Sequence, residues 1–554
     1  MLRRAALFFA GGAPMVGLKV RLKMRPMVRP MVRPMVWLIV GWMVALLGGL
    51  AGCASPPVRP PLPPASVLVA PADTPLGGLA RAHQVPEGRS GFRPMLISTI
   101  ALQARLSLIA DARVGIDLQT YYLADDATGQ QILRALRDAA LRGVRVRLLI
   151  DDFHSTGMTD LLLGLAAQPQ VEVRMYNPFS AGRDSNLVRI GQMIGDFSQL
   201  NRRMHNKLFI ADGRAAVVGG RNLADPYFMR SEQANFLDFD LLCVGQVVAD
   251  LGASFDRYWN SRFAVPLPAL ADNGLSVAQR QASFEQLSRK ARAPAPRAGS
   301  TGAGTAALRA LAALPLVVAD AQVYFDDPEK TGGAPGSPGG GPPLPVARLV
   351  NAAQERLLVV SPYFLPSDVG IRLLARAAQR GVTVQVLTNS LVDSDEPLVS
   401  LAYGNKRKAL LQAGVQLFEL SSQRLKQEEV LRQSLGESTG RLHAKLGIID
   451  DHLLLVGSMN IDPRSAATNT ELALVVDSAD LVRLILGQFQ PTESGAVFEV
   501  KLADDGRSLN WVGRGTVRRD GSGAPLHLAD EPTPPWWQHL RLWLLSALVP
   551  DEWL

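Results

Sequence analysis

The feature that most restricts the fold of this chain is a set of residues that occurs twice at a constant spacing. Five positions in the first half match five positions in the second half, and every pair is 238 residues apart. The pairs are Gly143 with Gly381, His205 with His443, Lys207 with Lys445, Asp212 with Asp450, and Asn222 with Asn460. Because chance does not repeat one offset at five such positions, the sequence predicts an internal duplication into two similar halves.

Both halves predict a similar order of helices and strands from the period of their apolar residues. The expected elements are a helix over 96–112, a strand over 114–122, a helix over 127–142 and a strand over 144–150, then a strand over 357–364, a helix over 367–380 and a strand over 382–387. Strand–helix–strand units favour a largely parallel sheet with helices packed on it. The predicted fold class is therefore α/β, with two similar domains.

The net charge of +8 is concentrated at the N-terminus. Residues 1–52 contain eight of the 58 basic side chains and no acidic one, so the remainder has 50 basic and 50 acidic residues. A protein that binds nucleic acid needs positive charge on the surface that makes the contact. The neutral remainder gives no support for such a partner, and no nucleic acid is expected.

The N-terminal segment is typical of an export signal. Basic residues precede an uncharged apolar run over 36–51, which is shorter than the roughly 20 residues that span a bilayer comfortably. Cys53 follows the tripeptide Leu-Ala-Gly, which resembles the lipobox of bacterial lipoproteins and implies cleavage before Cys53 and lipidation of its thiol. An uncleaved signal anchor is the alternative. The expected location is the cell envelope, with the exported protein anchored to a membrane.

Changes in composition set the expected boundaries between segments. The Trp- and Leu-rich end of the chain, residues 536–554, is compatible both with a membrane interface and with a helix docked on the core. The expected segments are a signal peptide over 1–52, a proline-rich tether over 53–88, a first domain over 89–287, a linker over 288–343, a second domain over 344–500 and a C-terminal extension over 501–554.

Each repeated motif predicts a hairpin with a histidine and a lysine on one face. His205 and Lys207 begin an apolar strand that ends at Asp212, and the second copy repeats this pattern from His443 to Asp450. Because residues two apart on a strand share a face, the imidazole and the ammonium of each motif point into one space.

An imidazole beside an ammonium suits phosphate chemistry. Lysine repels a divalent cation and no carboxylate cluster accompanies the motifs, so neither a metal site nor a cofactor is expected. Lysine supplies a compact charge for phosphate oxygens, and histidine acts as a nucleophile or proton donor near neutral pH. The residues after each motif predict support for the ligand, as small residues that allow close approach and amides that donate to negative charge: Gly220, Asn222, Ser458 and Asn460.

The H-x-K-x4-D pattern with its trailing small residues and asparagine, present twice over about 90–495, resembles the signature of the phospholipase D superfamily. The resemblance implies two α/β/α domains related by a pseudo-twofold axis, with one active site at their interface. It also implies that one histidine attacks phosphorus to form a phosphohistidine, while the other protonates the leaving alcohol and then activates the incoming one. We expect His205 to be the nucleophile and His443 the acid and base. The predicted catalytic set is completed by Lys207, Asp212, Lys445 and Asp450.

The family pattern also places an acid after each motif, where it orients the imidazole. In the second half, Glu471 fits this position well. In the first half, Asp240 aligns with Glu471 after an insertion of about seven residues. We therefore expect Glu471 and Asp240 to support the two histidines.

Several further segments are similar to the bacterial cardiolipin synthases, in particular to those of the C type: 119–122, 361–364, 388–391, 460–465 and the Trp- and Leu-rich C-terminus. This similarity implies transfer of a phosphatidyl group from one phospholipid to the hydroxyl of phosphatidylglycerol, with phosphatidylethanolamine as a further candidate substrate. Two alternatives stay open. One is a phospholipase D, or an exported phosphodiesterase or nuclease, that uses water as acceptor. The other is an envelope lipoprotein without catalytic activity.

Overall fold

The computed structural model describes residues 60–180, 182–195, 201–289, 316–333, 346–488, 490, 492–513 and 527–528. The chain divides into two units, 1–52 and 53–554, and every described residue belongs to the second unit. The predicted signal peptide, Cys53 and the tail over 536–554 lie outside the described residues. Within the described residues, the helices are too short or too polar to cross a membrane.

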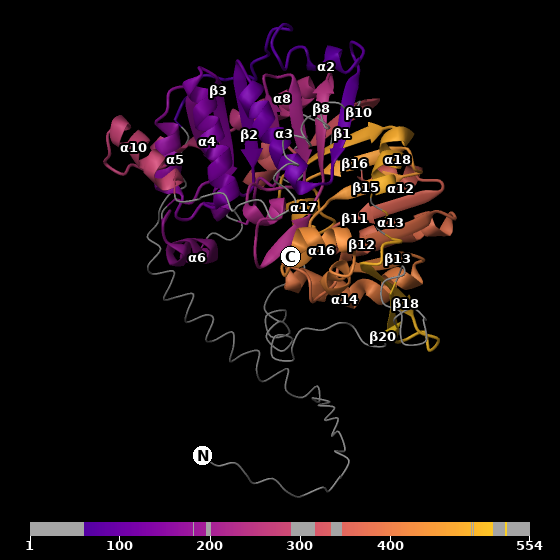
Figure 1. Cartoon of the computed structure of the whole chain (residues 1–554). Helices are drawn as coiled ribbons and strands as arrows, with labels where there is room; N and C mark the ends of the chain where they lie inside the picture. Colours follow the sequence, from indigo (N-terminus) through magenta and orange to yellow (C-terminus); the bar gives the residue numbers. More distant parts are fainter. Residues whose placement is uncertain are drawn as a thin grey trace, which may run out of the picture. The chain divides into compact units, whose positions relative to one another are not determined.

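The strands of both halves hydrogen-bond into one 18-stranded sheet (Figure 1). From edge to edge the strands are β9 (Ala264–Pro266), β4 (Val171–Tyr176), β3 (Arg145–Asp151), β2 (Gly115–Thr120), β5 (Leu208–Ala211), β6 (Ala215–Gly219), β8 (Asp240–Gly245), β1 (Ser90–Met95), β10 (Val317–Phe325), β17 (Leu472–Asp477), β16 (Leu453–Gly457), β15 (Leu446–Ile449), β11 (Arg356–Val360), β12 (Thr383–Asn389), β13 (Gln416–Leu420), β18 (Val497–Leu502), β19 (Leu509–Gly513) and β20 (His527–Leu528).

The order of these strands confirms the duplication. The two halves join through the antiparallel pair β1–β10, in which Gly91 faces Val318. Outward from this pair, β8, β6, β5, β2, β3 and β4 on one side correspond to β17, β16, β15, β11, β12 and β13 on the other. Gly143 and Gly381, the first matched pair, both follow a helix and both have φ of 93°, a conformation that glycine adopts easily. The two halves are therefore related by a pseudo-twofold axis at the β1–β10 pair.

The prediction of a largely parallel sheet is wrong. Four pairs of described strands in this sheet are parallel, namely β2–β3, β3–β4, β11–β12 and β12–β13, and the others are antiparallel. The difference arises because each motif forms a hairpin, β5–β6 or β15–β16, which enters the sheet between its parallel part and its centre. A hairpin reverses the chain without a crossover helix, so it adds antiparallel strands.

Helices cover both faces of the sheet and give the α/β/α layers that were expected (Figure 1). The longest are α3 (Ser98–Asp111), α4 (Ala127–Leu141), α8 (Val247–Trp259), α10 (Val277–Ser288), α13 (Asp368–Gln379) and α14 (Pro397–Gln412), and the shorter ones are α2 (Leu79–Ala82), α5 (Thr159–Ala166), α6 (Asn186–Gly195), α9 (Leu267–Leu270), α12 (Val346–Ala352), α15 (Ser422–Leu425), α16 (Glu429–Leu435), α17 (Pro463–Ala467) and α18 (Ala479–Gln488).

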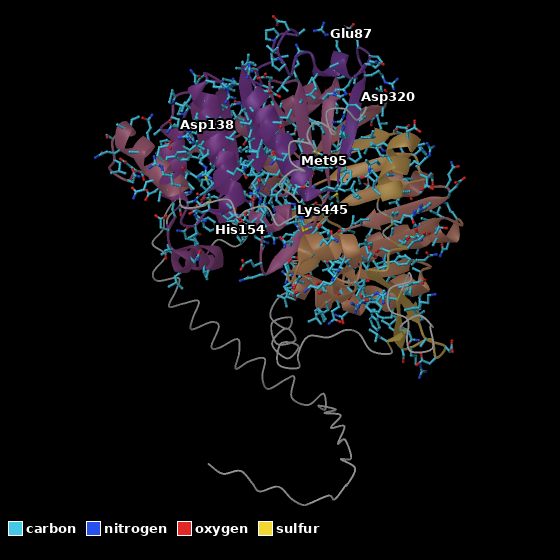
Figure 2. The ribbon with its side chains drawn as sticks, viewed as in Figure 1. Glu87, Met95, Asp138, His154, Asp320 and Lys445 are labelled. Atoms are coloured by element: carbon cyan, nitrogen blue, oxygen red, sulfur yellow. The ribbon has the colours of Figure 1, made fainter. Side chains whose placement is uncertain are left out.

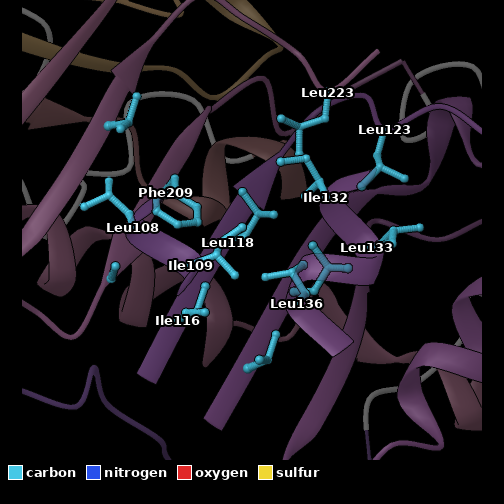
Figure 3. Packing of buried hydrophobic residues seen from close by; sticks show 14 of the residues in the cluster. Leu108, Ile109, Ile116, Leu118, Leu123, Ile132, Leu133, Leu136, Phe209 and Leu223 are labelled. Carbon is cyan, nitrogen blue, oxygen red and sulfur yellow. The ribbon is translucent and has the colours of Figure 1, made fainter. Parts of the chain in front are cut away.

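Two kinds of hydrophobic core hold these layers together. In the first half, Leu108 of α3 and Leu136 of α4 pack with Leu118 of β2 and Phe209 of β5 in a core that belongs to that half (Figure 3). A second core contains buried apolar side chains of both halves. There α8, which follows β8, packs on β10, and α18, which follows β17, packs on β1, so equivalent helices each contact the central strand of the other half. Burial of this shared apolar surface fixes the position of one motif relative to the other.

Three expected boundaries change in the structure. β10 lies inside the segment predicted as a linker, and β19 lies inside the predicted C-terminal extension. In the predicted tether, the backbone N–H of Val67 donates to the carboxylate of Asp256 at 2.9 Å. These short segments were missed because the proline- and glycine-rich stretches around them dominate the local composition.

Candidate active site

Each motif leads into a tight hairpin, as the sequence predicted. The turn between β5 and β6 places Asp212 and Gly213 at φ of 55° and 59°, and the turn between β15 and β16 places Asp450 and Asp451 at 50° and 53°. Positive φ at successive turn residues matches the twist of the flanking strands. The two motifs therefore enter the sheet with the same backbone geometry.

The backbone just before each histidine is held by a side chain at the end of a neighbouring strand. The N–H of Met204 donates to the carboxylate of Asp151 at 2.9 Å, and the N–H of Leu442 donates to the amide oxygen of Asn389 at 2.8 Å. Asp151 ends β3 and Asn389 ends β12. Side chains at the carboxyl ends of equivalent strands therefore accept the same backbone hydrogen bond in both halves.

Each motif also binds backbone of the opposite half. The N–H of His205 donates to the carbonyl of Thr470 at 3.0 Å, and the N–H of His443 donates to the carbonyl of Leu237 at 2.8 Å. Before His443, β14 (Thr439–Leu442) forms a parallel pair with β7 (Ala234–Leu237) of the first half. These bonds bring the segment after each motif to the histidine of the other motif.

A carboxylate from the opposite half contacts each imidazole. Nδ1 of His205 lies 3.0 Å from Oε2 of Glu471, and Nδ1 of His443 lies 2.7 Å from Oδ2 of Asp238. Both histidines are buried, with 7% and 3% of their surface exposed, and both carboxylates are buried as well. Because Nδ1 of each ring faces its carboxylate, Nε2 is the nitrogen directed away from it, and it is the one available for chemistry.

The prediction of Asp240 as the first acid is wrong, and Asp238 takes its place. Gly220 N–H donates to Phe239 O in the first half, and Ser458 N–H donates to Leu472 O in the second. The residues before these carbonyls, Asp238 and Glu471, are therefore equivalent. The insertion in the first half is five residues rather than the seven assumed.

Asp240 has a structural role two residues further along. Its buried carboxylate forms ion pairs with Arg105 at 2.9 Å and Arg221 at 3.1 Å. Arg221 also donates to the carbonyl of Asp238. Asp240 thus holds the backbone of the acid that contacts His443 without reaching an imidazole itself.

The two motif lysines are buried beside their histidines. The ammonium of Lys207 donates to the carbonyl of His205, and that of Lys445 to the carbonyl of His443, both at 2.7 Å. Burial and the charge of Lys445 lower the pKa of Lys207 to about 7, and burial lowers the pKa of Lys445 to about 8. In Figure 2, Lys445 is labelled where the purple first half meets the orange second half.

The two imidazoles differ in their electrostatic environment. Burial and the charges of Lys207 and Lys445 lower the pKa of His205 well below its usual value. Burial and Lys445 also lower the pKa of His443, but the carboxylate of Asp238 opposes them. Groups from both motifs act on His205, which shows that the two halves contribute to one site. His205 is the imidazole more strongly held in its neutral form.

The small residues predicted to lie close to a ligand, Gly220 and Ser458, contact the supporting acids. A Cβ on Gly220 would lie 2.2 Å from Oδ1 of Asp238, so a larger residue would displace this carboxylate. In the second half, the hydroxyl of Ser458 donates to Glu471, and Ser465 donates to the other carboxylate oxygen at 2.7 Å. The prediction that these small residues also allow a ligand to approach closely stays a prediction.

The two predicted asparagines are both buried in the site but differ in their contacts. Nδ2 of Asn222 donates to the hydroxyl of Tyr227 at 2.8 Å, and the Tyr227 ring packs edge-on against His443. Oδ1 of Asn222 and Oδ1 of Asn460 have no hydrogen-bond partner within the described part of the chain. The prediction that both amides donate to a phosphate stays a prediction.

Asp212 and Asp450 lie at the far ends of their strands and do not enter the site. Asp212 accepts the backbone N–H groups of Arg113, Val114 and Gly115 at 2.7–3.0 Å. Asp450 accepts the corresponding three N–H groups, those of residues 354, 355 and 356. Burial acts to raise the pKa of Asp450, but these amides outweigh it and lower the pKa. Their prediction as catalytic residues is wrong, since they anchor each hairpin to the start of β2 or β11.

Two buried histidines, each with a lysine and a carboxylate, form a site typical of enzymes that act on phosphodiesters. Residues 106–259 and 346–492 match the family model described as cardiolipin synthase, PLD-like domain. The chain is 36% identical over 480 residues to cardiolipin synthase C of Escherichia coli (strain K12), covering 84% of this chain and 96% of that protein. The chain therefore belongs to the phospholipase D superfamily and is an enzyme of that type.

More distant relatives agree with this assignment. The chain is 30% identical over 433 residues to an uncharacterized protein of Helicobacter pylori (strain ATCC 700392 / 26695), covering 75% of this chain and 82% of that one. It is 26% identical over 369 residues to cardiolipin synthase B of Salmonella typhi, covering 66% and 72%. Phosphatidylserine synthase of Haemophilus influenzae Rd KW20 superposes with a TM-score of 0.52 at 13% identity, over 86% of this chain and 100% of that one, which shows a shared fold.

Replacement of Asp212 by alanine should destabilise the protein without removing a reacting group. Three backbone N–H groups, of which that of Gly115 is buried, lose a charged acceptor, and we expect the free energy of unfolding to fall by about 2–4 kcal/mol. Urea unfolding measures this loss, and Asp450→Ala, at a more exposed site, should cost less. An Asp212→Ala protein with wild-type stability but no turnover would restore a catalytic role for this residue.

Binding of a phosphodiester should weaken as pH rises through the pKa values of the two lysines. Below pH 7 both ammonium groups are charged, and above pH 8 both are largely neutral in the free enzyme. We expect the dissociation constant of a phosphonate diester, whose own charge is constant in this range, to rise at least about tenfold from pH 6 to pH 9. Calorimetric titration measures it, and a constant value across this range would show that the lysines do not hold the ligand.

Proposed function

We propose that this enzyme is a phosphatidyltransferase that makes cardiolipin from membrane phospholipids through a phosphohistidine intermediate. The observation that carries the proposal is the exchange of carboxylates between the halves, which directs Nε2 of both histidines toward one buried, cationic space. The choice of lipid as substrate is supported by 36% identity to cardiolipin synthase C over 96% of its length.

His205 is the nucleophile in this proposal, and His443 is the general acid and base. A nucleophilic imidazole must be neutral, and the pKa of His205 is the more strongly lowered of the two, by burial and by the motif lysines. A general acid must take up a proton, and Asp238 supports the charged form of His443. Burial acts to raise the pKa of Asp238, but His443 outweighs it and holds this pKa at about 2, so the carboxylate stays ionised.

In the first step, Nε2 of His205 forms a bond to phosphorus and the bond between phosphorus and the headgroup oxygen breaks. Protonated His443 gives its proton to the departing oxygen, so the headgroup leaves as a neutral alcohol and His443 becomes neutral. Lys207 and Lys445 offset the charge on the non-bridging oxygens. The diacylglycerol phosphate is then attached to His205.

In the second step, the terminal hydroxyl of phosphatidylglycerol gives its proton to His443 and its oxygen bonds to phosphorus. The bond from phosphorus to His205 breaks, and its electron pair returns to the ring nitrogen. One phosphodiester has replaced another, so the reaction balances without an oxidant or a cofactor. With water in place of the alcohol, the same steps would release phosphatidic acid.

Purified full-length protein should convert labelled phosphatidylglycerol into a diphosphatidyl product, both with and without added phosphatidylethanolamine. His205→Ala and His443→Ala should each lower the rate at least about a thousandfold, because each removes a group that takes part in bond making or proton transfer. Thin-layer chromatography of the lipids separates the products. Phosphatidic acid as the sole product would indicate a hydrolase, and the absence of any product from folded protein would indicate a non-catalytic lipoprotein.

We further propose that the protein is exported and anchored to a membrane of the cell envelope through lipidated Cys53. The support is the sequence alone, since Cys53 follows Leu-Ala-Gly after an uncharged apolar run. In cells, Cys53→Ser should move the protein from the membrane to the soluble fraction and abolish its labelling by a fatty acid. Membrane-bound, unlabelled wild-type protein would instead indicate an uncleaved signal anchor.

A further inference from the structure

We propose that Asp395 binds the alcohol headgroup beside His443 and selects alcohols that carry a second hydrogen-bond donor on the carbon next to the reacting one. This inference rests on the proposed function and extends it to the chemistry of the headgroup. The donor is a hydroxyl in a glycerol headgroup and an ammonium in an ethanolamine headgroup. Water, the acceptor of a hydrolase, has no such group.

The carboxylate of Asp395 uses one oxygen within the protein and leaves the other without a partner. Oδ2 accepts the hydroxyl of Tyr363 at 2.6 Å. Oδ1 is shielded from solvent and has no hydrogen-bond partner among the described side chains and backbone. An unpartnered buried carboxylate oxygen is costly, so a ligand that donates to it would bind favourably.

Tyr363 places the carboxylate of Asp395 on the His443 side of the site. The Tyr363 ring stands edge-on to the imidazole of His443, with 6.3 Å between centroids. The ammonium of Lys445 lies 5.8 Å from the centroid of the same ring. Asp395 is thus hydrogen-bonded to a tyrosine whose ring lies beside both His443 and Lys445.

The electrostatic effects of Asp395 agree with this position. Burial and Lys445 lower the pKa of His443, and Asp395 is among the charges that oppose this change. Burial also lowers the pKa of Lys445, and Asp395 again opposes it. In the proposed reaction, His443 is the residue that exchanges a proton with the alcohol, so Asp395 lies on the side where the alcohol enters and leaves.

The loop after β3 contains a buried carboxylate for comparison, although its position is not equivalent to that of Asp395. After β3, Asp152 forms ion pairs with Arg183 at 2.7 Å and with Arg189 at 3.5 Å. After β12, Asp395 forms no ion pair with any described lysine or arginine. Unlike Asp152, Asp395 therefore keeps a carboxylate oxygen that no described cation or donor satisfies.

An open carboxylate repels a phosphate, so the part of the substrate that meets Asp395 is not the phosphate. The remaining polar part of a phospholipid near the reacting bond is its headgroup alcohol. Glycerol and ethanolamine both carry a donor on the carbon next to the carbinol carbon, within reach of an oxygen beside the reacting centre. A hydrogen bond to a charged acceptor is among the stronger ones in proteins, which is enough for selection between alcohols.

A competition between two alcohols that differ in this donor alone tests the inference. The full-length enzyme is given phosphatidylglycerol with equal concentrations of 1,2-propanediol and 1-propanol, and the two phosphatidyl alcohols are quantified by mass spectrometry. We expect the wild type to favour the diol at least about tenfold, as a charged hydrogen bond predicts, and Asp395→Asn and Asp395→Ala to bring the ratio close to one. A product ratio does not depend on the total activity of a variant.

Asp368→Asn is the matched control, because it removes an exposed carboxylate of the same half and should keep the wild-type ratio. Replacing the diol by ethanolamine identifies the donor, since a larger effect of Asp395→Asn on ethanolamine assigns the site to an ammonium and an equal effect assigns it to any donor.

An unchanged ratio in both Asp395 variants overturns the inference while the diphosphatidyl product still supports the proposed function. Equal loss of transfer to both alcohols also overturns it, because Asp395 would then serve the chemistry rather than selection. If the wild type transfers to no alcohol, the proposed function fails and the inference fails with it.

Discussion

The structure of the active site depends on an exchange of carboxylates between the two halves of the chain. Glu471 of the second half contacts His205 of the first, and Asp238 of the first contacts His443 of the second. Each half alone would carry a histidine and a lysine without the acid that sets the orientation and the tautomer of the ring. The central β1–β10 pair and the shared hydrophobic core are the means by which the fold keeps these bonds in register.

Burial of several cationic groups in one space determines how the site responds to a ligand. Without a bound anion, burial and Lys445 lower the pKa of Lys207, and burial and both lysines lower that of His205, so part of the positive charge is lost near neutral pH. A phosphodiester would restore that charge. The surroundings of the two histidines differ: Asp238 supports charge on His443, and Asp395, on the same side, keeps an oxygen without a partner among the described residues. These differences allow two nearly equivalent motifs to take different roles.

Sequence reasoning predicted the duplication, the hairpins and the histidine–lysine pairs, because all of these follow from residue spacing and apolar period. It failed where a contact joins segments far apart in the chain. Asp240 was predicted where Asp238 is found, because the pairing of β7 with β14, which sets the register, occurs between halves. Asp212 was assigned to the chemistry because a motif does not show which end of its strand faces the site. The antiparallel strands of the sheet were missed because the parallel pairing expected of the strand–helix–strand units was assumed for the whole sheet.

The central claim is that the two motifs act on one phosphorus atom in different roles, and trapping the covalent intermediate tests it most directly. Full-length enzyme is mixed with phospholipid labelled at phosphorus, quenched in base to preserve phosphohistidine, and digested for peptide mapping. The account predicts label on the peptide that contains His205, in the wild type and in His443→Asn, and no label in His205→Asn. Label on His443, or label that persists after His205 is replaced, would contradict the assignment of roles, and its absence from every variant would contradict the covalent mechanism.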